Sequence, residues 1–107
     1  MTNQLTKDQL IKQVEQWSKD KDLHNGNSDR QALKFYEEAG EVGAALSRGN
    51  LEALKDGIGD TVVTLIILAQ QHDMTLQECL QFAYDEIKGR KGKTINGTFV
   101  KEADLKE

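Results

Sequence analysis

The sequence contains no proline and a single cysteine, Cys79, in 107 residues. Because proline ends or kinks helices, its absence leaves the helical segments uninterrupted. One cysteine cannot form a disulfide within the chain, and no signal peptide is recognisable, so we expect a reducing, cytoplasmic location. The longest apolar run, residues 62–69, is far too short to span a bilayer, and we expect no membrane partner.

Basic residues are outnumbered: 14 Lys and Arg stand against 18 Asp and Glu, which gives a net charge of −4. A protein that binds the phosphate backbone of nucleic acid needs a basic surface, so we expect no nucleic-acid partner. A phosphate ligand that arrives with a divalent metal ion is still allowed. The length fits one small domain over residues 1–107, with loose tails at 1–5 and 101–107.

Apolar residues recur at helical spacing in four segments of the chain. We predict helices from Thr6 to about Lys19, from Ser28 to near Gly49, from Leu51 to about Gln71 and from Thr75 to near Lys88. Residues 20–27 are polar and predict a loop. The second half of the third helix is apolar nearly all round, so we expect neighbours to enclose it, within the chain or across a dimer.

Capping residues mark the ends of these segments. The capping-box pattern recurs in three pairs, Thr6 with Gln9, Ser28 with Gln31, and Thr75 with Glu78. Asn50 is a candidate cap for the third helix, and Gly49 for the end of the second. After the fourth helix, Asn96-Gly97 predicts a hairpin turn. The sequence therefore predicts an all-α, four-helix bundle-like domain with a short C-terminal hairpin or extended tail.

Five carboxylates lie on the second and third predicted helices: Glu37, Glu38, Glu41, Asp56 and Asp60. The three glutamates fall within about 100° of arc, and the two aspartates are one helical turn apart. A short turn near Gly49 makes the two helices antiparallel neighbours, and both acidic turns lie at similar distances from it. We therefore expect the two acidic turns to face each other.

Carboxylates gathered in one cleft repel one another unless they are protonated or bind metal. Hard divalent cations with oxygen ligands relieve that repulsion, Mg²⁺ above all and Mn²⁺ as an alternative. Gly40, Gly57 and Gly59 remove side chains beside the acids and leave space for water or substrate, although a helical glycine costs about 1 kcal/mol. The plainer interpretation is a solvated acidic face paired with Lys34 and Lys55. The coincidence of acids, glycines and an adjoining apolar core favours the metal site.

The segments KFYEEAGEV and KDGIGDTVVTLIILA resemble, in their order and spacing, the MazG-like, all-α nucleoside triphosphate pyrophosphohydrolase superfamily. The resemblance extends over about residues 10–100 and is greatest to short, single-domain, phage and Gram-positive-type members. It implies Mg²⁺ ligands on a Glu-x-x-Glu motif of one helix and a Glu-x-x-Asp motif of the next. Glu38 and Glu41 match the first motif, with Glu37 as the preceding acid, and Asp60 matches the end of the second.

The sequence departs from the second motif at Gly57, where the resemblance implies an acid. Asp56, one position earlier, is the available substitute. This departure leaves the fourth ligand and the number of metal ions open.

Further residues are candidate substrate contacts. The resemblance favours Lys88 and Arg90 as partners of triphosphate oxygens, and the alternative is that this basic cluster complements a helix dipole. Asp85 lies where the family usually has asparagine and is a candidate for a sugar hydroxyl or for supporting the metal ligands. Trp17 is either a core residue or, as the resemblance implies, an aromatic against the nucleobase. Lys34 either contacts a phosphate or balances the glutamates.

We predict Mg²⁺-dependent hydrolysis of a nucleoside triphosphate to the monophosphate and pyrophosphate, for nucleotide-pool control or house-cleaning. The expected metal ligands are Glu38, Glu41, Asp56 and Asp60. Glu37 or Glu38 would orient or deprotonate the attacking water. The apolar third helix and the resemblance predict a homodimer or homotetramer. The alternatives are a dUTP- or phosphoribosyl-ATP-type pyrophosphatase, and a non-enzymatic helical adaptor, which Gly57 keeps open.

Overall fold

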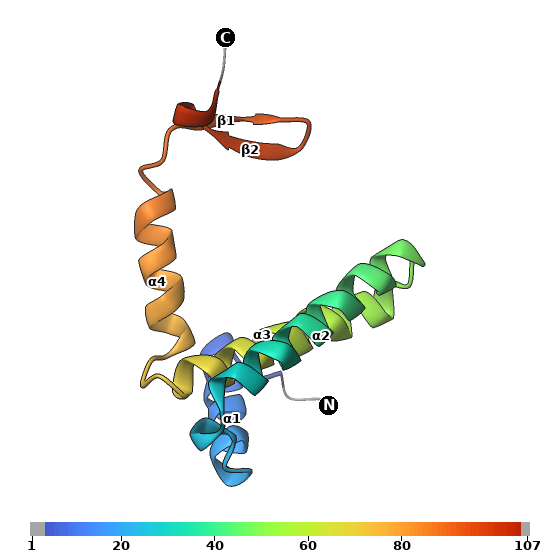
Figure 1. Cartoon of the computed structure of the whole chain (residues 1–107), viewed down its shortest axis with the longest axis vertical. Helices are drawn as coiled ribbons and strands as arrows, with labels where there is room; N and C mark the ends of the chain where they lie inside the picture. Colours follow the sequence, from blue (N-terminus) through green and yellow to red (C-terminus); the bar gives the residue numbers. More distant parts are fainter. Residues whose placement is uncertain (1–3, 106–107) are drawn as a thin grey trace. The chain divides into compact units, whose positions relative to one another are not determined.

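The computed structural model describes residues 4–105, in which two compact units follow one another: the first ends at Leu76 and the second begins at Gln77 (Figure 1). The described residues are mostly helical, with four α-helices and one two-stranded sheet. This confirms the predicted helical class with a C-terminal hairpin. That the four helices associate into one bundle-like domain stays a prediction. None of the described helices combines the length and apolar character that a membrane crossing requires.

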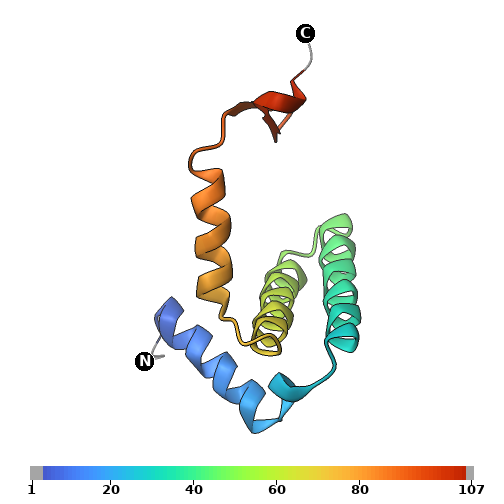
Figure 2. The same cartoon turned by 60° about the vertical axis from the view of Figure 1, so that its left-hand side comes forward.

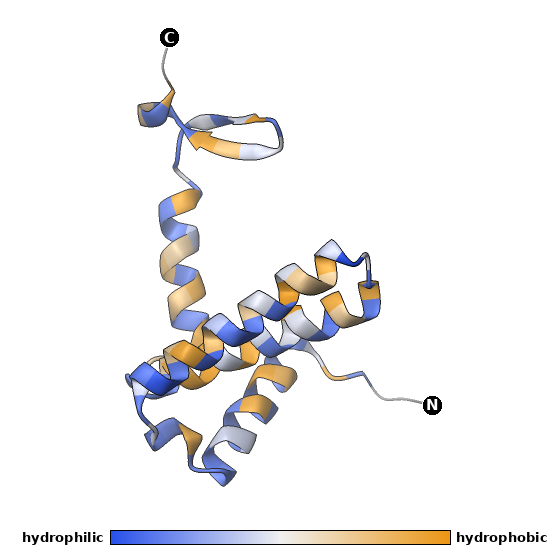
Figure 3. Ribbon diagram, turned by 45° about the vertical axis from the view of Figure 1, so that its right-hand side comes forward, coloured by the Kyte–Doolittle hydropathy of each residue, from blue (hydrophilic) through white to orange (hydrophobic). Residues whose placement is uncertain are grey.

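The first unit is built on an antiparallel pair of long helices, α2 (Ser28–Ser47) and α3 (Leu51–Gln70) (Figures 1 and 2). Helix α1 (Lys7–Asp20) packs against α3, and a short 3₁₀ helix, Leu23–Asn25, contacts both α1 and α3. Hydrophobic and hydrophilic residues alternate along the helices (Figure 3). Each helix therefore has an apolar side that neighbours can cover.

Side-chain caps begin helices α1 and α3 as the sequence predicts. The Thr6 hydroxyl accepts a hydrogen bond from the Gln9 N–H, and the Gln9 side chain accepts one from the Thr6 N–H, which completes the capping box. The Asn50 side chain accepts from the Ala53 N–H at 3.1 Å. Both caps give partners to N–H groups that have none within the helix.

Helix α2 begins with a different cap from the predicted one. The Asn27 side chain accepts a hydrogen bond from the Arg30 N–H at 3.0 Å, so the predicted capping box of Ser28 and Gln31 is wrong. Asparagine is among the preferred N-cap residues and takes the position one residue before Ser28. The Gln31 amide instead donates to the backbone carbonyl of Thr64 on α3, at 3.0 Å.

The turn between α2 and α3 confirms the predicted glycine cap. Gly49 has a φ of 67°, a left-handed conformation that glycine adopts without a Cβ clash. The Asn50 N–H donates to the Ala45 carbonyl, and the Gly49 N–H donates to the Leu46 carbonyl. These two bonds form a Schellman motif, which ends α2 and reverses the chain direction.

The core of the first unit surrounds the second half of α3. Its most buried apolar residues, each at most 5% exposed, are Ala45, Ile66, Ile67 and Ala69. The Gln70 amide donates to the Glu15 carbonyl at 3.1 Å, and the Gln71 amide donates to the Leu23 carbonyl at 3.0 Å. These bonds join the end of α3 to α1 and to the 3₁₀ helix. The predicted enclosure of this apolar half is confirmed for the residues in the core.

The predicted loop at residues 20–27 contains more regular structure than expected. Asp20 still belongs to α1, and Leu23–Asn25 form a 3₁₀ helix. Asp22 has a left-handed φ of 57°, and its carboxylate accepts a hydrogen bond from the Asn25 amide at 2.8 Å. Asp and Asn side chains stabilise such local turns, which is why a polar segment is ordered here.

Helix α4 (Leu76–Ile87) leads into a hairpin of strands β1 (Gly92–Ile95) and β2 (Thr98–Lys101). The strands pair in antiparallel register. Asn96 and Gly97 both have positive φ, at 52° and 80°. Two successive left-handed residues form the type I′ turn that matches the twist of a hairpin. The predicted hairpin is therefore confirmed.

The predicted loose tails are only partly described. Lys101 ends β2 and Glu102–Asp104 form a 3₁₀ helix, so the segment expected to be loose from residue 101 is ordered as far as residue 104. At the other end, residues 4 and 5 have no regular secondary structure. The rest of both predicted tails, residues 1–3 and 106–107, lies outside the described residues.

Candidate functional site

Helices α2 and α3 carry the two acidic turns at matching heights. Gln31 is hydrogen-bonded to Thr64, and further along the pair Val42 packs on Gly57. Residue numbers thus rise along α2 while they fall along α3. Glu38 and Asp60 therefore lie level with each other, and both line the same cleft.

This cleft, here named the Trp17 cleft, has a volume of about 420 Å³. Its walls come from α1, the 3₁₀ helix, α2 and α3, and its lining residues are Trp17, Leu23, Gln31, Lys34, Glu38, Asp60, Val63, Thr64 and Ile67. Trp17 is 47% exposed. The tryptophan is thus a wall of the cleft beside the acids, and it is not enclosed in the core.

Lys34 and Glu38 form an ion pair in the Trp17 cleft. The Lys34 Nζ lies 3.4 Å from Glu38 Oε1 and 3.7 Å from Glu37 Oε2, and both Lys34 and Glu37 are largely exposed. The hydrogen bond to Glu38, then the charges of both glutamates, raise the pKa of Lys34 above its usual 10.5. The Glu38 side chain is only 12% exposed, and its other oxygen, Oε2, is buried with no hydrogen-bond partner among the described residues.

A second cleft, here named the Glu41 cleft, has a volume of about 330 Å³. It is lined by Glu41, Ala44, Ala45, Arg48, Ala53, Asp56, Gly57 and Asp60. Asp60 lines both clefts, so the two are neighbours. Arg48 was not a sequence-predicted site residue. It follows Glu41 by two helical turns, and this same-face spacing is the signal that could have found it.

Two of the acids, Glu41 and Asp60, have a raised pKa. The charge of Glu38, and a hydrogen bond with it, raise the pKa of Glu41, and Asp60 adds to the effect. Burial, followed by the charges of Asp56 and Glu38, raises the pKa of Asp60. Lys34 opposes both shifts but does not cancel them. The carboxylates therefore form one electronegative group with too little positive charge around it.

At Gly57, α3 packs closely against α2. A Cβ at this position would lie 3.1 Å from Val42 Cγ2, which is closer than most packed Cβ contacts, and 3.6 Å from Val42 Cα. The expectation that Gly57 leaves space for water or substrate is therefore wrong, because Val42 fills that space. Gly40 and Gly59, in contrast, have nothing within 4 Å of the Cβ position.

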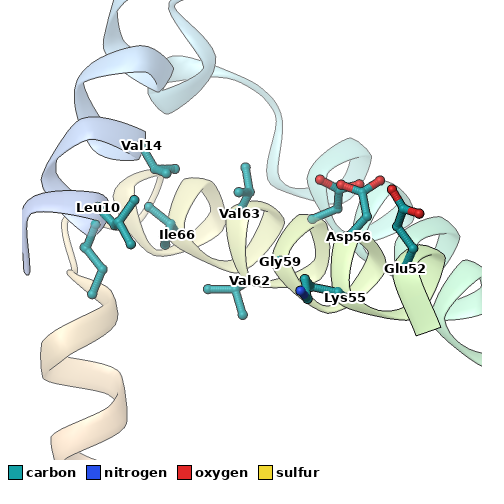
Figure 4. A pocket seen from close by; sticks show the side chains of 11 residues that line it. Leu10, Val14, Glu52, Lys55, Asp56, Gly59, Val62, Val63 and Ile66 are labelled. Atoms are coloured by element: carbon teal, nitrogen blue, oxygen red, sulfur yellow. The ribbon is translucent and has the colours of Figure 1, made fainter. Parts of the chain in front are cut away.

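A larger groove of about 800 Å³ extends along α3 (Figure 4). Leu10 and Val14 of α1 lie beside Ile66 at its apolar end, and Glu52 and Asp56 lie at its acidic end. The acids of α3 thus adjoin apolar surface. The plainer interpretation, a solvated face paired with Lys34 and Lys55, agrees with the ion pairs of Lys34 and with Lys55 in this groove, but it does not include the adjoining apolar surface.

Three sequence-predicted residues, Asp85, Lys88 and Arg90, belong to the second unit. The Lys88 Nζ lies 3.0 Å from Asp85 Oδ1 and 5.8 Å from the centre of the Tyr84 ring. Asp85 also accepts a hydrogen bond from the Gln81 amide at 3.0 Å. These contacts are local to the end of α4, and the predicted substrate contacts of the three residues stay predictions.

Within residues 4–105, no three His, Cys, Asp or Glu side chains are placed to hold a metal ion together. The charges of neighbouring carboxylates are close enough to raise the pKa of Glu41 and of Asp60. Side-chain rotation would be required for them to share one ion.

One similar protein comes from Haemophilus phage HP1 (strain HP1c1), an uncharacterized 18.2 kDa protein in the rep-hol intergenic region. The two sequences are 38% identical over 65 residues, which make up 60% of this chain and 40% of the phage protein. The chain thus matches less than half the length of that relative. No family model matches the sequence, and no solved structure matches it.

Proposed function

We propose that this protein is a Mg²⁺-dependent nucleoside triphosphate pyrophosphohydrolase, which releases a nucleoside monophosphate and pyrophosphate for nucleotide-pool control or house-cleaning. The Trp17 cleft carries the proposal, because it combines carboxylates from two facing helices with a lysine and a half-exposed tryptophan. Phosphates bound through a divalent cation need carboxylate ligands on the protein, and a nucleobase stacks on aromatic surface.

The proposed metal ligands are Glu38, Glu41, Asp56 and Asp60. All offer carboxylate oxygens, which Mg²⁺ prefers and Mn²⁺ accepts. The buried, unpartnered Oε2 of Glu38 and the raised pKa of Glu41 and of Asp60 support this fit. A bound divalent cation supplies positive charge that neutralises phosphate oxygens and lowers the pKa of a water molecule.

In the proposed reaction, a water oxygen bonds to the α-phosphorus while the bond from that phosphorus to the α–β bridging oxygen breaks. Pyrophosphate leaves with that oxygen. Glu38, or Glu37 beside it, takes the proton of the water. The Lys34 ammonium holds a phosphate oxygen in the way it now holds the Glu38 carboxylate, at 3.4 Å.

Lys88 and Arg90 are proposed to stabilise charge on the leaving pyrophosphate, and Asp85 to contact a sugar hydroxyl. The Lys88 side chain is 54% exposed and its partner Asp85 is 50% exposed. An exposed ion pair contributes little to stability, so Lys88 can exchange Asp85 for phosphate at small cost.

We propose a homodimer, or a homotetramer built from dimers, as the assembled state. Large apolar side chains of the α2–α3 pair are 52–76% exposed, namely Leu33, Tyr36, Leu46, Leu51 and Ile58. Burial of such surface against a second copy is favourable. Because the net charge is −4, we propose no nucleic-acid partner. We also propose no membrane partner and a cytoplasmic location.

A non-enzymatic helical adaptor is the second candidate. It is favoured by Gly57, which packs on Val42 and carries no acid.

The test is pyrophosphate release from a panel of nucleoside triphosphates, with dUTP and phosphoribosyl-ATP included, in the presence and absence of Mg²⁺. We expect Glu41→Gln and Asp60→Asn each to lower the metal-dependent activity about 100-fold or more. Residues that only hydrogen-bond to metal ligands already contribute up to about that factor, and a ligand itself should contribute at least as much. Asp29→Asn, an acid in the first turn of α2, is the control and should keep wild-type activity.

Two outcomes would contradict the proposal. Wild-type protein that releases no pyrophosphate under any condition would support the adaptor. Full metal-dependent activity in both variants would place the site elsewhere.

A further inference from the structure

The Trp17 cleft changes in chemical character along its length. At one end lie the carboxylates of Glu38 and Asp60. At the other end lies Gln31, which is hydrogen-bonded to Thr64. Leu23 lies at this second end too, because its carbonyl accepts from Gln71, the C-cap residue of α3, which follows Thr64 by seven residues. One end is therefore acidic, and the other is apolar with a single amide.

The spacing of these groups suits a nucleotide. Gln31 and Glu38 are seven residues apart on one face of α2, which corresponds to about 10 Å along the helix. Lys34 lies between them, and Trp17 lines the same cleft. A nucleotide covers a comparable length from its α-phosphate to the far edge of its base. Phosphates at the acidic end therefore place the base edge near Gln31.

The orientation of the Gln31 amide is fixed by its partner. A backbone carbonyl can only accept, so the nitrogen Nε2 must face the Thr64 oxygen, at 3.0 Å. Thr64 is only 4% exposed, and its own hydroxyl is occupied by a bond to the Thr61 carbonyl. The hydrogen bond is therefore shielded from water, and the carbonyl oxygen Oε1 is the acceptor that Gln31 offers to a ligand.

We infer that Gln31 is a specificity-determining residue, whose Oε1 accepts a hydrogen bond from the amino group at C4 of a cytosine base or at C6 of an adenine base. This inference rests on the proposed function and names its substrate class as cytosine or adenine nucleotides. Uracil, thymine and guanine carry a carbonyl oxygen where cytosine and adenine carry the amino group. That oxygen would meet Oε1, another acceptor, and leave both without a donor, a mismatch that costs roughly tenfold in affinity or more.

The experiment measures binding of four non-hydrolysable α,β-methylene triphosphates, those of cytosine, adenine, uracil and guanine, in the presence of Mg²⁺. Trp17 is the only tryptophan of the chain, so its fluorescence reports occupation of the cleft. We expect the better amino-base analogue to bind about tenfold more tightly than either keto-base analogue. Gln31→Met should reduce that ratio to about threefold or less, because thioether sulfur is only a weak acceptor.

The matched control is Gln70→Met, since Gln70 also donates from its amide to a backbone carbonyl, that of Glu15. It should keep the wild-type ratio, because a merely structural loss of one such bond does not change base preference. If Gln31→Met does not fold, Gln31→Asn keeps an amide but withdraws it by one methylene, and the same fall in the ratio is expected.

The inference is overturned if Gln31→Met keeps the wild-type ratio, if keto-base analogues bind as tightly as amino-base analogues, or if no analogue binds. The proposed function fails separately. If analogues bind with the expected ratio while the ordinary triphosphates release no pyrophosphate, the base-reading role stands and the enzymatic role does not.

Discussion

The two halves of α3 belong to one continuous helix but differ in burial and in their hydrogen bonds to neighbouring helices. In the first half, Leu51–Asp60, Gly57 is the only buried residue, and Leu51 and Ile58 are 76% and 52% exposed. In the second half, Thr61–Gln70, Thr64, Ile66, Ile67 and Ala69 are all buried. Hydrogen bonds from Gln31 and Gln70 join that second half to α2 and α1.

The difference indicates a division of roles along the helix. The second half makes the contacts that stabilise the first unit. The first half extends two aspartates toward the glutamates of α2, where their charges repel. Carboxylates that lower stability at neutral pH while a neighbouring core stabilises the helix are typical of a functional site.

The largest expected effect tests this division directly. Ile66 is 2% exposed in the second half of α3, so Ile66→Ala should lower the free energy of unfolding by about 2–5 kcal/mol. Ile58 is 52% exposed in the first half, and Ile58→Ala should cost well under half as much when the protein is too dilute to dimerise. Urea denaturation of both variants provides the comparison. Equal losses would show that the two halves contribute alike to stability.

Much of the helical framework could be predicted from the sequence, because its signals are local. The capping box at Thr6, the cap at Asn50, the left-handed Gly49 and the Asn96-Gly97 turn all depend on residues within a few positions. The apolar second half of α3 likewise predicts its own burial. Such features follow from backbone sterics and capping chemistry, which one segment contains by itself.

Features that depend on contacts between segments could not be predicted in the same way. Gly57 is packed against Val42, fifteen residues earlier, and no local pattern distinguishes it from the open Gly59. Gln31 fits a capping-box pattern, yet its amide reaches Thr64 on the next helix. In the candidate site, the facing of Glu38 and Asp60 follows from helix phase and turn length, and the spacing from Glu41 could have found Arg48. Thr64, in contrast, enters the site only through packing.

A pair of glycine variants, with a smaller expected effect, sharpens the comparison within the first half. Gly59 has open space around its Cβ position, so Gly59→Ala should raise the free energy of unfolding by up to about 1 kcal/mol through helix propensity. At Gly57 the new methyl would press on Val42, and overpacking of this kind costs roughly 1–3 kcal/mol.

Gly57→Ala should therefore be destabilising, opposite in sign to Gly59→Ala, when both are compared with wild type by chemical denaturation. The double variant Gly57→Ala with Val42→Ala should recover part of the loss, because the shortened side chain makes room. Stabilisation by Gly57→Ala alone would show that α2 and α3 separate easily and that Gly57 is not a packing requirement.

The smallest expected effect concerns charge. Because the pKa of Asp60 is raised above its usual 3.8, the folded chain binds that proton more tightly than the unfolded chain does, and stability falls as the pH rises through the raised value. Without metal at neutral pH, Asp60→Asn should therefore melt slightly above wild type. Added Mg²⁺ should raise the wild-type melting temperature by mass action and leave the variant nearly unchanged. A variant that melts below wild type without metal would mean that the Asp60 carboxylate stabilises the fold. Both halves of α3 would then contribute to stability, and they would differ only in burial.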